Sequence, residues 1–470
     1  MSSGEQALGP SGAVIIGAAT ALYAAVTAYL LFGVDRADAL AICLCAGLLV
    51  LSYAVAVRAL PLRAALGIGL ALRVAAVFAW PALSDDVYRF LWDGELWLAG
   101  IHPLDAPPSA LADAGAAGAA FAKTHSDLLG AMNSPNYYTV YPPLAQTVFA
   151  AAVYLGRDPA MSVMLMKVVL LTAEGGTLFL IYALTRTAGP LPTTAYALHP
   201  LPIVELVGNA HFEAIAVCGV LGAVYWLRWA GASQTHGVLA LRHYALGGVS
   251  LALGALAKLV PLLFAPALFF AALWRGEREP RWRGGLTAAS ACALVLAGGF
   301  AFFFAGADVG GFGDSLDLYF RSFEFNGSLY ALARGIGWWY RGWNWIAVVG
   351  PALALLGVVG VLALSLTRGY RGAAEAETLL WCAAVYLLCA TTVHPWYFAY
   401  LVALGCLTPY RWPLLLGLTS LLSYVAYAQE LIAVPGWALA LEYLPPALLA
   451  VFEVRRRGNS VGGVKRTFAR

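Results

Sequence analysis

Long apolar runs, separated by short polar connections, dominate this chain. Runs such as 11–32, 39–57 and 285–304 each approach the roughly 20 apolar residues with which a helix crosses a bilayer. The pattern predicts an all-α polytopic membrane protein with about twelve transmembrane helices, within a range of about 10–14. The first run is longer than the apolar core of about 7–15 residues in a secretory signal. No small-residue cleavage site follows it, so we expect it to be retained as an anchor.

Composition supports a single integral membrane domain over residues 1–470. The chain is 61% hydrophobic and 11% charged, whereas a soluble domain is about 25% charged. So few charges cannot cover a water-facing surface, and we expect membrane lipids around most of the protein. No basic soluble segment is interleaved with aromatic residues, which argues against a nucleic-acid partner. All seven cysteines lie in apolar runs, which argues against disulfides and a zinc site.

The distribution of basic residues predicts the orientation. Arginines concentrate in a few connections: Arg58, Arg63, Arg228, Arg242, Arg275, Arg278, Arg281, Arg283, Arg368, Arg371 and Arg411. The positive-inside rule places these connections, and the basic tail 453–470, on the cytoplasmic side. Three regions then lie outside: a long acidic loop over 83–143, a second loop over 307–344 that is rich in glycine and aromatics, and a short turn around 394–397.

Two stretches conflict with simple spanning. The apolar pattern over 198–214 is interrupted by proline, histidine and asparagine, so we interpret it as re-entrant or half-spanning. Broken backbone at membrane depth is tolerated only inside protein or along a water-filled cavity. The stretch 243–274 has basic connections at both ends, and a hairpin of two short helices with Lys258 at its outer tip resolves that conflict.

The strongest candidate for chemistry is the acidic segment directly after the third apolar run. Asp85 and Asp86 are adjacent, and neighbouring carboxylates disfavour joint ionisation, which suits one of them to general-base catalysis. Arg89 follows one helical turn later, and Trp92 with Trp97 predicts an amphipathic face in the membrane interface. The alternative is that these acids simply mark the end of a span.

A second polar group lies inside an apolar context. Glu205, Asn209 and Glu213 recur at i, i+4 and i+8, so on one helix they would share a face, with His211 beside them. Ionisable groups at membrane depth mark a functional cavity or an internal ion pair. We favour function, and the ion pair stays open.

Several outer residues carry donors that a lipid-linked phosphate needs at headgroup level: Lys258, Arg321 and His394. Each has an ordinary alternative, as an interfacial side chain or a satisfied histidine. Four further ionisable residues have no visible partner and are interpreted as packing or span-end groups: Arg73, Lys167, Glu174 and Glu442.

The order and spacing of these motifs resemble those of the glycosyltransferase-C superfamily, in particular bacterial polyprenyl-phosphate-mannose-dependent mannosyltransferases. The motifs that carry the resemblance cover most of the chain from about residue 80 onward: residues 84–94, 100–103, 141–144, 208–211, 325–328 and 394–397. The resemblance implies transfer of a hexose, with mannose favoured, from a polyprenyl phosphate to a hydroxyl group of a glycan or lipid acceptor. It implies a multi-pass protein of the bacterial cytoplasmic (inner) membrane, with the active site facing the periplasm or exterior.

The resemblance also implies roles for individual residues. The base would be Asp85 or Asp86, in an inverting transfer that is metal-independent or weakly assisted by a divalent cation; no cofactor is indicated. The leaving phosphate would be bound by Arg89, Lys258, Arg321 and His394. Substrate contacts would come from Trp92, Asp93, Tyr141, Glu205, Asn209, His211, Asn326, Trp396 and Tyr397.

Two other functions stay open at this point. A transporter or flippase of lipid-linked saccharides would also place polar residues in a membrane cavity, although no internal repeat is visible here. A polyprenyl-diphosphate-glycan ligase or polymerase would place its essential arginine and histidine in a late outer loop, where Arg321 and His394 lie.

Overall fold

Helices make up the body of the protein in the computed structural model. It describes residues 10–231, 237–274, 282–307, 309–371, 374–429 and 432–467. The α-helices are α1 (Pro10–Phe32), α2 (Ala39–Ala59), α3 (Leu62–Phe78), α4 (Asp86–Leu98), α5 (Ala116–Thr124), α6 (Ser126–Ala131), α7 (Pro143–Gly156), α8 (Pro159–Thr185), α9 (Leu191–Ala197), α10 (Glu213–Ala230), α11 (Gly237–Ala257), α12 (Ala265–Trp274), α13 (Trp282–Phe303), α14 (Val309–Arg321), α15 (Ser328–Arg341), α16 (Ile346–Tyr370), α17 (Glu375–Cys389), α18 (Ala399–Cys406), α19 (Trp412–Thr419) and α20 (Gly436–Thr467). Shorter turns of other helix types are η1 (Pro108–Asp113), η2 (Arg186–Ala188), η3 (Pro202–Gly208), η4 (Val260–Phe264), η5 (Pro395–Phe398) and η6 (Ser420–Ala428).

Many of these helices can cross a bilayer. Within the described residues, eight helices are long and apolar enough: α1, α2, α8, α10, α11, α13, α16 and the part of α20 over Gly436–Arg457. Shorter apolar helices cover Pro143–Gly156, Val260–Trp274, Pro395–Cys406 and Trp412–Ala428. The predicted all-α polytopic membrane fold is therefore confirmed, while a count of about twelve crossings stays a prediction.

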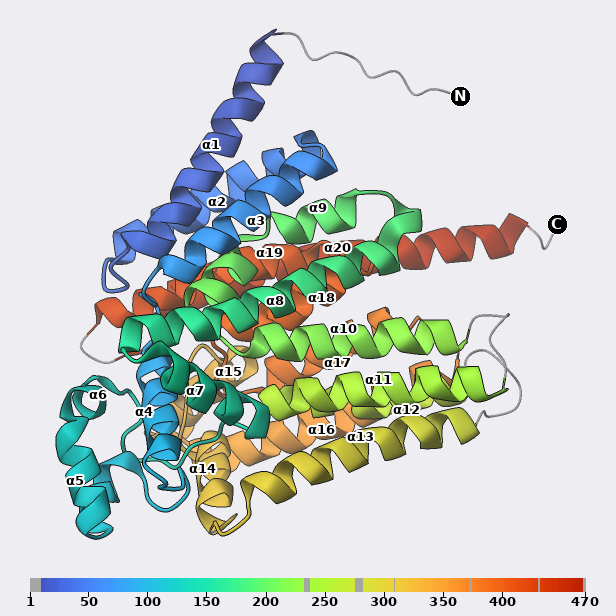
Figure 1. Ribbon diagram of the computed structural model, residues 1–470. Helices are drawn as coiled ribbons and strands as arrows, with labels where there is room; N and C mark the ends of the chain where they lie inside the picture. Colours follow the sequence, from blue (N-terminus) through green and yellow to red (C-terminus); the bar gives the residue numbers. More distant parts are fainter. Residues whose placement is uncertain are drawn as a thin grey trace.

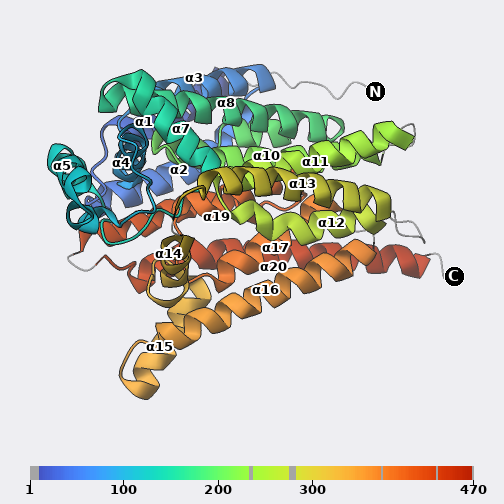
Figure 2. The same cartoon turned by 60° about the horizontal axis from the view of Figure 1, so that its bottom comes forward.

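The polar segments gather at one end of the helix bundle. Figure 1 shows the long helices running side by side, with α4, α5, α6 and α14 at one end and the C-terminus at the other. The turned view in Figure 2 places α15 at the same end as α14. The two long loops predicted to be outside therefore share one end, which is the arrangement that the orientation prediction requires.

The predicted interruption before α10 is present. The chain passes from α9 through the wide turn of η3, and α10 begins only at Glu213. Pro200 and Pro202 each lack a backbone donor and so break a regular helix. Ala210 then adopts a left-handed conformation with φ of 60°, which is uncommon for a residue with a Cβ atom. This strained turn aims the residues on its two sides in different directions.

The hairpin around Lys258 is also present, but one of its arms is longer than predicted. Lys258 follows the end of α11, and η4 and α12 form the returning arm. Helix α11 has 21 residues, because it continues upstream of His243 through Arg242, which the charge pattern placed in a loop. It is long enough to span the membrane by itself, so the expectation of two short helices was wrong for this arm.

The four ionisable residues without visible partners in the sequence have partners inside the protein. Arg73 Nε lies 3.1 Å from Glu174 Oε2, and both side chains are fully buried. Lys167 donates to two backbone carbonyls at the end of α3. Glu442 Oε1 accepts from Asn326 Nδ2 at 2.8 Å. All four side chains are fully buried, which agrees with the interpretation as packing groups, and their partners are distant in sequence.

Helix α4 packs directly on α7, and Gly94 allows that approach. A Cβ atom on Gly94 would lie 2.6 Å from Val153 Cγ2 and 2.8 Å from the Phe149 carbonyl oxygen. Contacts this short force backbone shifts, and overpacking of this kind destabilises proteins by about 1–3 kcal/mol.

We therefore expect Gly94→Ala to lower the thermal unfolding temperature of the detergent-purified protein, because the added methyl group pushes α4 away from α7. Gly130→Ala is the matched control: Gly130 lies in α6 of the same loop, and nothing lies within 4 Å of the added Cβ atom. Equal unfolding temperatures for the two variants would contradict the close packing of α4 on α7.

Candidate active site

A polar cavity of about 310 Å³ opens at the end of the bundle where α4 begins. Its walls come from segments that are far apart in sequence: residues 84–89, 133–141, Lys258, 323–325 and 392–397. Ser315, Tyr427 and Ile432 complete the lining. The cavity therefore brings together the acidic segment, the hairpin tip and the late turn that sequence patterns singled out separately.

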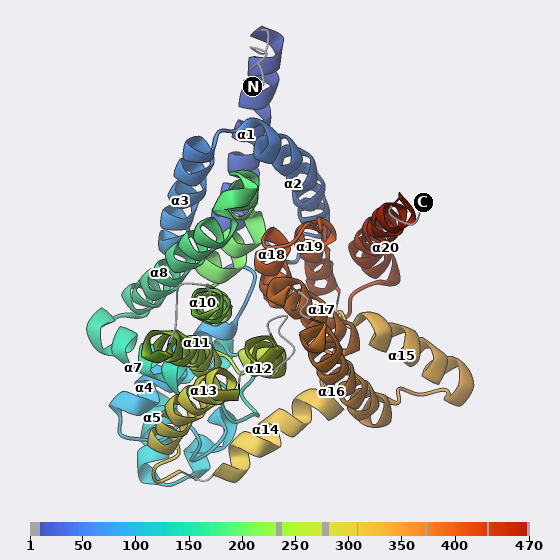
Figure 3. The same cartoon turned by 90° about the vertical axis from the view of Figure 1, so that its right-hand side faces the viewer.

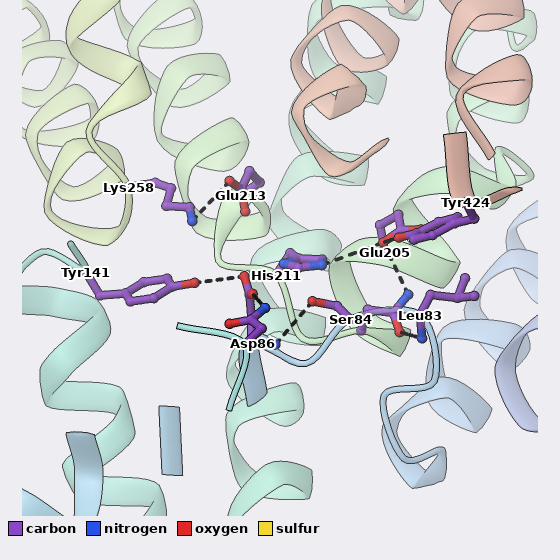
Figure 4. A network of polar contacts seen from close by, with 11 residues as sticks. Leu83, Ser84, Asp86, Tyr141, Glu205, His211, Glu213, Lys258 and Tyr424 are labelled. Atoms are coloured by element: carbon purple, nitrogen blue, oxygen red, sulfur yellow. Dashed lines mark hydrogen bonds and ion pairs between the residues drawn. The ribbon is translucent and has the colours of Figure 1, made fainter. Parts of the chain in front are cut away.

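Asp86 occupies one wall of this cavity. Its Oδ2 atom accepts a hydrogen bond from the Tyr141 hydroxyl group at 2.9 Å, and its Oδ1 atom accepts one from Asn133 Nδ2 at 3.1 Å. Figure 4 shows the Tyr141 hydroxyl group pointing at Asp86, with Lys258 and Glu213 nearby. Asp86 is thus held by neutral donors while it remains partly exposed to the cavity.

The surroundings of Asp86 favour its ionised form. Burial raises the pKa of the Asp86 carboxyl group, but the electrostatic influence of His211 and Lys258 and the hydrogen bond from Asn133 outweigh burial. The pKa of Asp86 therefore lies below the usual aspartate value. A carboxylate that is ionised near neutral pH accepts hydrogen bonds only and can take up a proton.

Asp85 has a different partner. Its Oδ2 atom lies 2.5 Å from Arg36 NH2, and the Arg36 guanidinium group also lies 4.5 Å above the ring of Tyr427. Arg36 comes from the connection between α1 and α2, and sequence reasoning did not identify it. The signal that could have found it is a positive charge on a connection that the positive-inside rule assigns to the outside.

Removing Arg36 should change the pH dependence of activity. In Arg36→Ala, Asp85 loses its counter-charge and repels Asp86, so the pKa of Asp86 rises and the acidic limb of the kcat profile moves to higher pH. Arg36→Lys should restore part of this shift, because it keeps the charge, whereas Arg63→Ala, on an exposed position of α3, should have no effect. A pH profile of Arg36→Ala that matches wild type would show that the Arg36–Asp85 pair does not influence Asp86.

Lys258 is held at the cavity wall by two contacts. Its Nζ atom lies 3.5 Å from Glu213 Oε1 and 4.5 Å from the centre of the Tyr141 ring. The Lys258 side chain is 17% exposed, so it is only weakly screened by water. The hairpin tip thus supplies a positive charge next to Asp86.

Glu205, Asn209 and Glu213 do not share one face. Asn209 Nδ2 donates to Glu205 Oε2 at 3.2 Å, which agrees with the predicted i, i+4 spacing. The turn at Ala210 then redirects Glu213 toward Lys258. The prediction of a single polar face was wrong for Glu213, because the helix breaks between Asn209 and α10.

Glu205 and Asn209 support the start of the acidic segment. The Tyr424 hydroxyl group lies 3.0 Å from both Glu205 oxygen atoms. Asn209 Oδ1 accepts from the backbone N–H of Leu83 at 3.1 Å. Neither Glu205 nor Asn209 lines the cavity, so both act on Asp86 through the backbone that precedes it.

Four aromatic rings form a row at the cavity; three of them line it, and the fourth, His211, is buried outside the lining. His211 stacks on Trp396 at 3.7 Å between ring centres, Trp396 on His394 at 4.4 Å, and His394 on Phe325 at 4.7 Å. Burial lowers the pKa of His394 to about 4, against the opposing influence of Asp86. His394 is therefore neutral at pH 7 and would offer a phosphate a hydrogen bond rather than a positive charge.

Backbone pairing holds this row in place. The Phe325 N–H donates to the Thr391 carbonyl at 3.1 Å, and the Val393 N–H donates to the Phe325 carbonyl at 2.7 Å. Asn326 adopts a left-handed conformation with φ of 55° and faces Glu442 rather than the cavity. Trp396 and Tyr397 line the cavity; because Trp396 is stacked between His211 and His394, a sugar can reach only the edge of its ring.

Other predicted site residues lie around the cavity rather than in it. Trp92 is fully buried and packs on Phe121 with 5.0 Å between ring centres. Asp93 accepts from Gln146 Nε2 at 2.8 Å and is also fully buried. The expected amphipathic face in the membrane interface was wrong for Trp92, because α4 buries this side within the loop and against α7.

The two remaining predicted phosphate ligands are Arg89 and Arg321. Arg89 lines the cavity, but its NH2 atom donates to the carbonyls of Ser134, at 3.0 Å, and Tyr137. Those hydrogen bonds hold the segment 134–137 close to α4, next to Asp86. Arg321 ends α14, and its side chain lies outside the described residues. Binding of phosphate by either residue stays a prediction.

Comparison with known proteins identifies the family. A model of the N-terminal domain of alpha-(1->6)-mannopyranosyltransferases matches residues 8–275, which is more than half of the chain and includes Arg36, Asp85, Asp86 and Lys258. No curated protein and no solved structure matched the chain. The match confirms the resemblance to mannosyltransferases and favours transfer over transport. The chain therefore belongs to the alpha-(1->6)-mannopyranosyltransferase family and is a multi-pass membrane mannosyltransferase.

Proposed function

We propose that the protein transfers a mannosyl group from a polyprenyl-phosphate donor to a hydroxyl group of a glycan or lipid acceptor. The active site would face the periplasm of a bacterial cytoplasmic membrane, where the positive-inside rule places this end of the bundle. The observation that carries the proposal is the cavity in which Asp86, held by neutral donors, lies beside the positive charge of Lys258.

Asp86 would act as the general base. As the acceptor oxygen bonds to the anomeric carbon, the acceptor proton passes to the Asp86 carboxylate. The bond between that carbon and the phosphate oxygen breaks, and polyprenyl monophosphate leaves with the electron pair. This single displacement inverts the anomeric configuration, so an α-linked product requires a β-linked donor.

Lys258 would stabilise the phosphate as it leaves. Negative charge grows on the bridging oxygen in the transition state, and a fixed cation in a poorly hydrated site lowers the barrier. Glu213 keeps the ammonium group in position before the donor arrives. His394, neutral and stacked between Trp396 and Phe325, would add a hydrogen bond.

The direct test offers purified protein two donors in parallel, polyprenyl-phosphate [³H]mannose and radiolabelled GDP-mannose, with a membrane extract as acceptor. We expect label to reach the acceptor only from the lipid donor. Transfer from GDP-mannose in the absence of lipid would overturn the donor assignment. Movement of lipid-linked sugar across liposomes without a new glycosidic bond would instead support a flippase.

Orientation can be tested with single cysteines. Asp113 is exposed in the long loop. The cysteine of the Asp113→Cys variant should react with a membrane-impermeant maleimide added to intact spheroplasts. Arg63→Cys should react only after permeabilisation, because Arg63 lies toward the other end of the bundle. All seven native cysteines are at least partly buried, which keeps the background low, and the reverse labelling pattern would place the cavity on the cytoplasmic side.

A further inference from the structure

A second, apolar groove lies at the opposite end of the bundle from the active site. It has a volume of about 230 Å³ and is bordered by α2, α9, α19 and α20. The Arg36 connection leads into the first residue of α2, whereas the groove surrounds its last turns. The groove follows α2 from Val50 to Arg58, which at 1.5 Å per residue is about 17–29 Å from the first residue of the helix, so it lies in the half of the membrane away from Asp85. Figure 3, viewed toward this end, shows α19 between α2 and α20.

The walls of the groove suit a hydrocarbon chain. They are formed by valine, leucine and alanine side chains and by the ring of Tyr53. The Tyr53 hydroxyl group donates to the Ala195 carbonyl at 2.9 Å, so the ring presents only its apolar surface. Leu191, at one edge, is 39% exposed, so within the described part of the chain this edge of the groove is open.

Two arginines lie at the mouth of this groove. Arg58 comes from the last turn of α2 and Arg411 from the residue before α19, and both are exposed. Both side chains line the groove, together with Tyr53. Arg58 NH1 donates to the Ala54 carbonyl of its own helix at 2.9 Å.

The nearest acid does not neutralise this pair of arginines. The Glu453 carboxylate accepts hydrogen bonds from the backbone N–H groups of Arg411, at 3.0 Å, and Trp412, at 3.4 Å. Glu453 therefore caps the first turn of α19. Within the part of the chain that the structure describes, neither the Arg58 nor the Arg411 guanidinium group forms an ion pair.

We propose that this groove binds an anionic phospholipid from the leaflet opposite the active site, with an acyl chain along Tyr53 and the phosphate between Arg58 and Arg411. Guanidinium groups match phosphate oxygens in geometry and charge, and basic pockets between membrane helices recognise anionic headgroups. The bound lipid bridges α2 and α19. It stabilises the packing of helices whose other ends carry Arg36 and lead to Tyr427.

Thermal unfolding of the detergent-purified full-length protein tests this site. Phosphatidylglycerol should raise the unfolding temperature more than phosphatidylcholine does, and the double variant Arg58→Gln/Arg411→Gln should lose that excess. Its apparent affinity for phosphatidylglycerol should fall at least tenfold. Arg63→Gln, which removes an exposed arginine outside the groove, should keep the excess, and Arg58→Lys/Arg411→Lys should retain part of it.

Two further measurements distinguish the contribution of the lipid headgroup from that of the acyl chain. Glycerol 3-phosphate alone should not stabilise the protein, because it lacks the acyl chain. Ala54→Phe, which fills the groove, should reduce the phospholipid retained in native mass spectra. Equal stabilisation of the wild type by the two lipids, or an undiminished excess in the double glutamine variant, overturns the proposal. If the double glutamine variant does not fold, the double lysine variant and Ala54→Phe serve as the test. The site is rejected if both of these variants retain as much phospholipid as the wild type.

Discussion

Asp86→Asn should lower kcat for mannosyl transfer by about 10³-fold, at the centre of the range of about 10²–10⁴ that a general base contributes. Asparagine has nearly the same shape and still accepts a hydrogen bond from Tyr141, so the cavity should persist. What it cannot do is take up the acceptor proton. Initial rates at saturating donor and acceptor measure the loss, and an unchanged unfolding temperature shows that the variant is folded.

Asp85→Asn gives the sharpest comparison, because the two carboxylates are neighbours in sequence and differ in their partners. We expect a loss of about tenfold or less, since Asp85 is paired with Arg36 and is therefore a weaker proton acceptor than Asp86. Asp113→Asn, an exposed carboxyl group in the same loop, should behave as wild type. If Asp85→Asn abolishes transfer while Asp86→Asn retains most of it, the assignment of the base is reversed.

Lys258→Gln should lower kcat by about 10²–10³-fold, the loss typical of removing one group that stabilises a developing negative charge. The donor KM should rise less, because the charge on the bridging phosphate oxygen is largest in the transition state. Lys258→Arg should recover part of the rate, since it keeps the charge in a different shape.

Glu213 complicates this variant, because it is fully buried. Removing one partner of a buried ion pair destabilises a protein by about 3–5 kcal/mol. The matched control is the double variant Lys258→Gln/Glu213→Gln, which removes both charges and should regain stability without regaining activity. A double variant that turns over at the wild-type rate would show that Lys258 only neutralises Glu213.

Local patterns in the sequence predicted much of the fold. Apolar runs located the spanning helices, and charge placed the acidic segment and Lys258 at one end of the bundle. The first prediction depends on the hydropathy of neighbouring residues. The second depends on the preference of arginine for one side of a membrane. Prolines around 200–202 predicted the break before α10 for the same local reason.

Local sequence patterns could not predict the contacts between segments that are distant in sequence. Arg36 and Asp85 are 49 positions apart, and Asn326 and Glu442 are 116 apart. No periodicity links such pairs, because their proximity depends on how helices pack. The left-handed turn at Ala210 was likewise invisible, since alanine favours a continuous helix, and the direction of Glu213 was missed with it.

The pairing of Glu205 with Tyr424 has a consequence for biosynthesis. These residues are separated by 219 positions, so at about 5–20 residues per second the ribosome needs about 10–40 s to reach the tyrosine after it has made the acid. During that interval Glu205, and through Asn209 the segment before Asp86, lack one of their anchors. The cavity is also lined by residues 392–397 and by Tyr427, so a partly synthesised chain holds Asp86 and Lys258 before the pocket around them is complete.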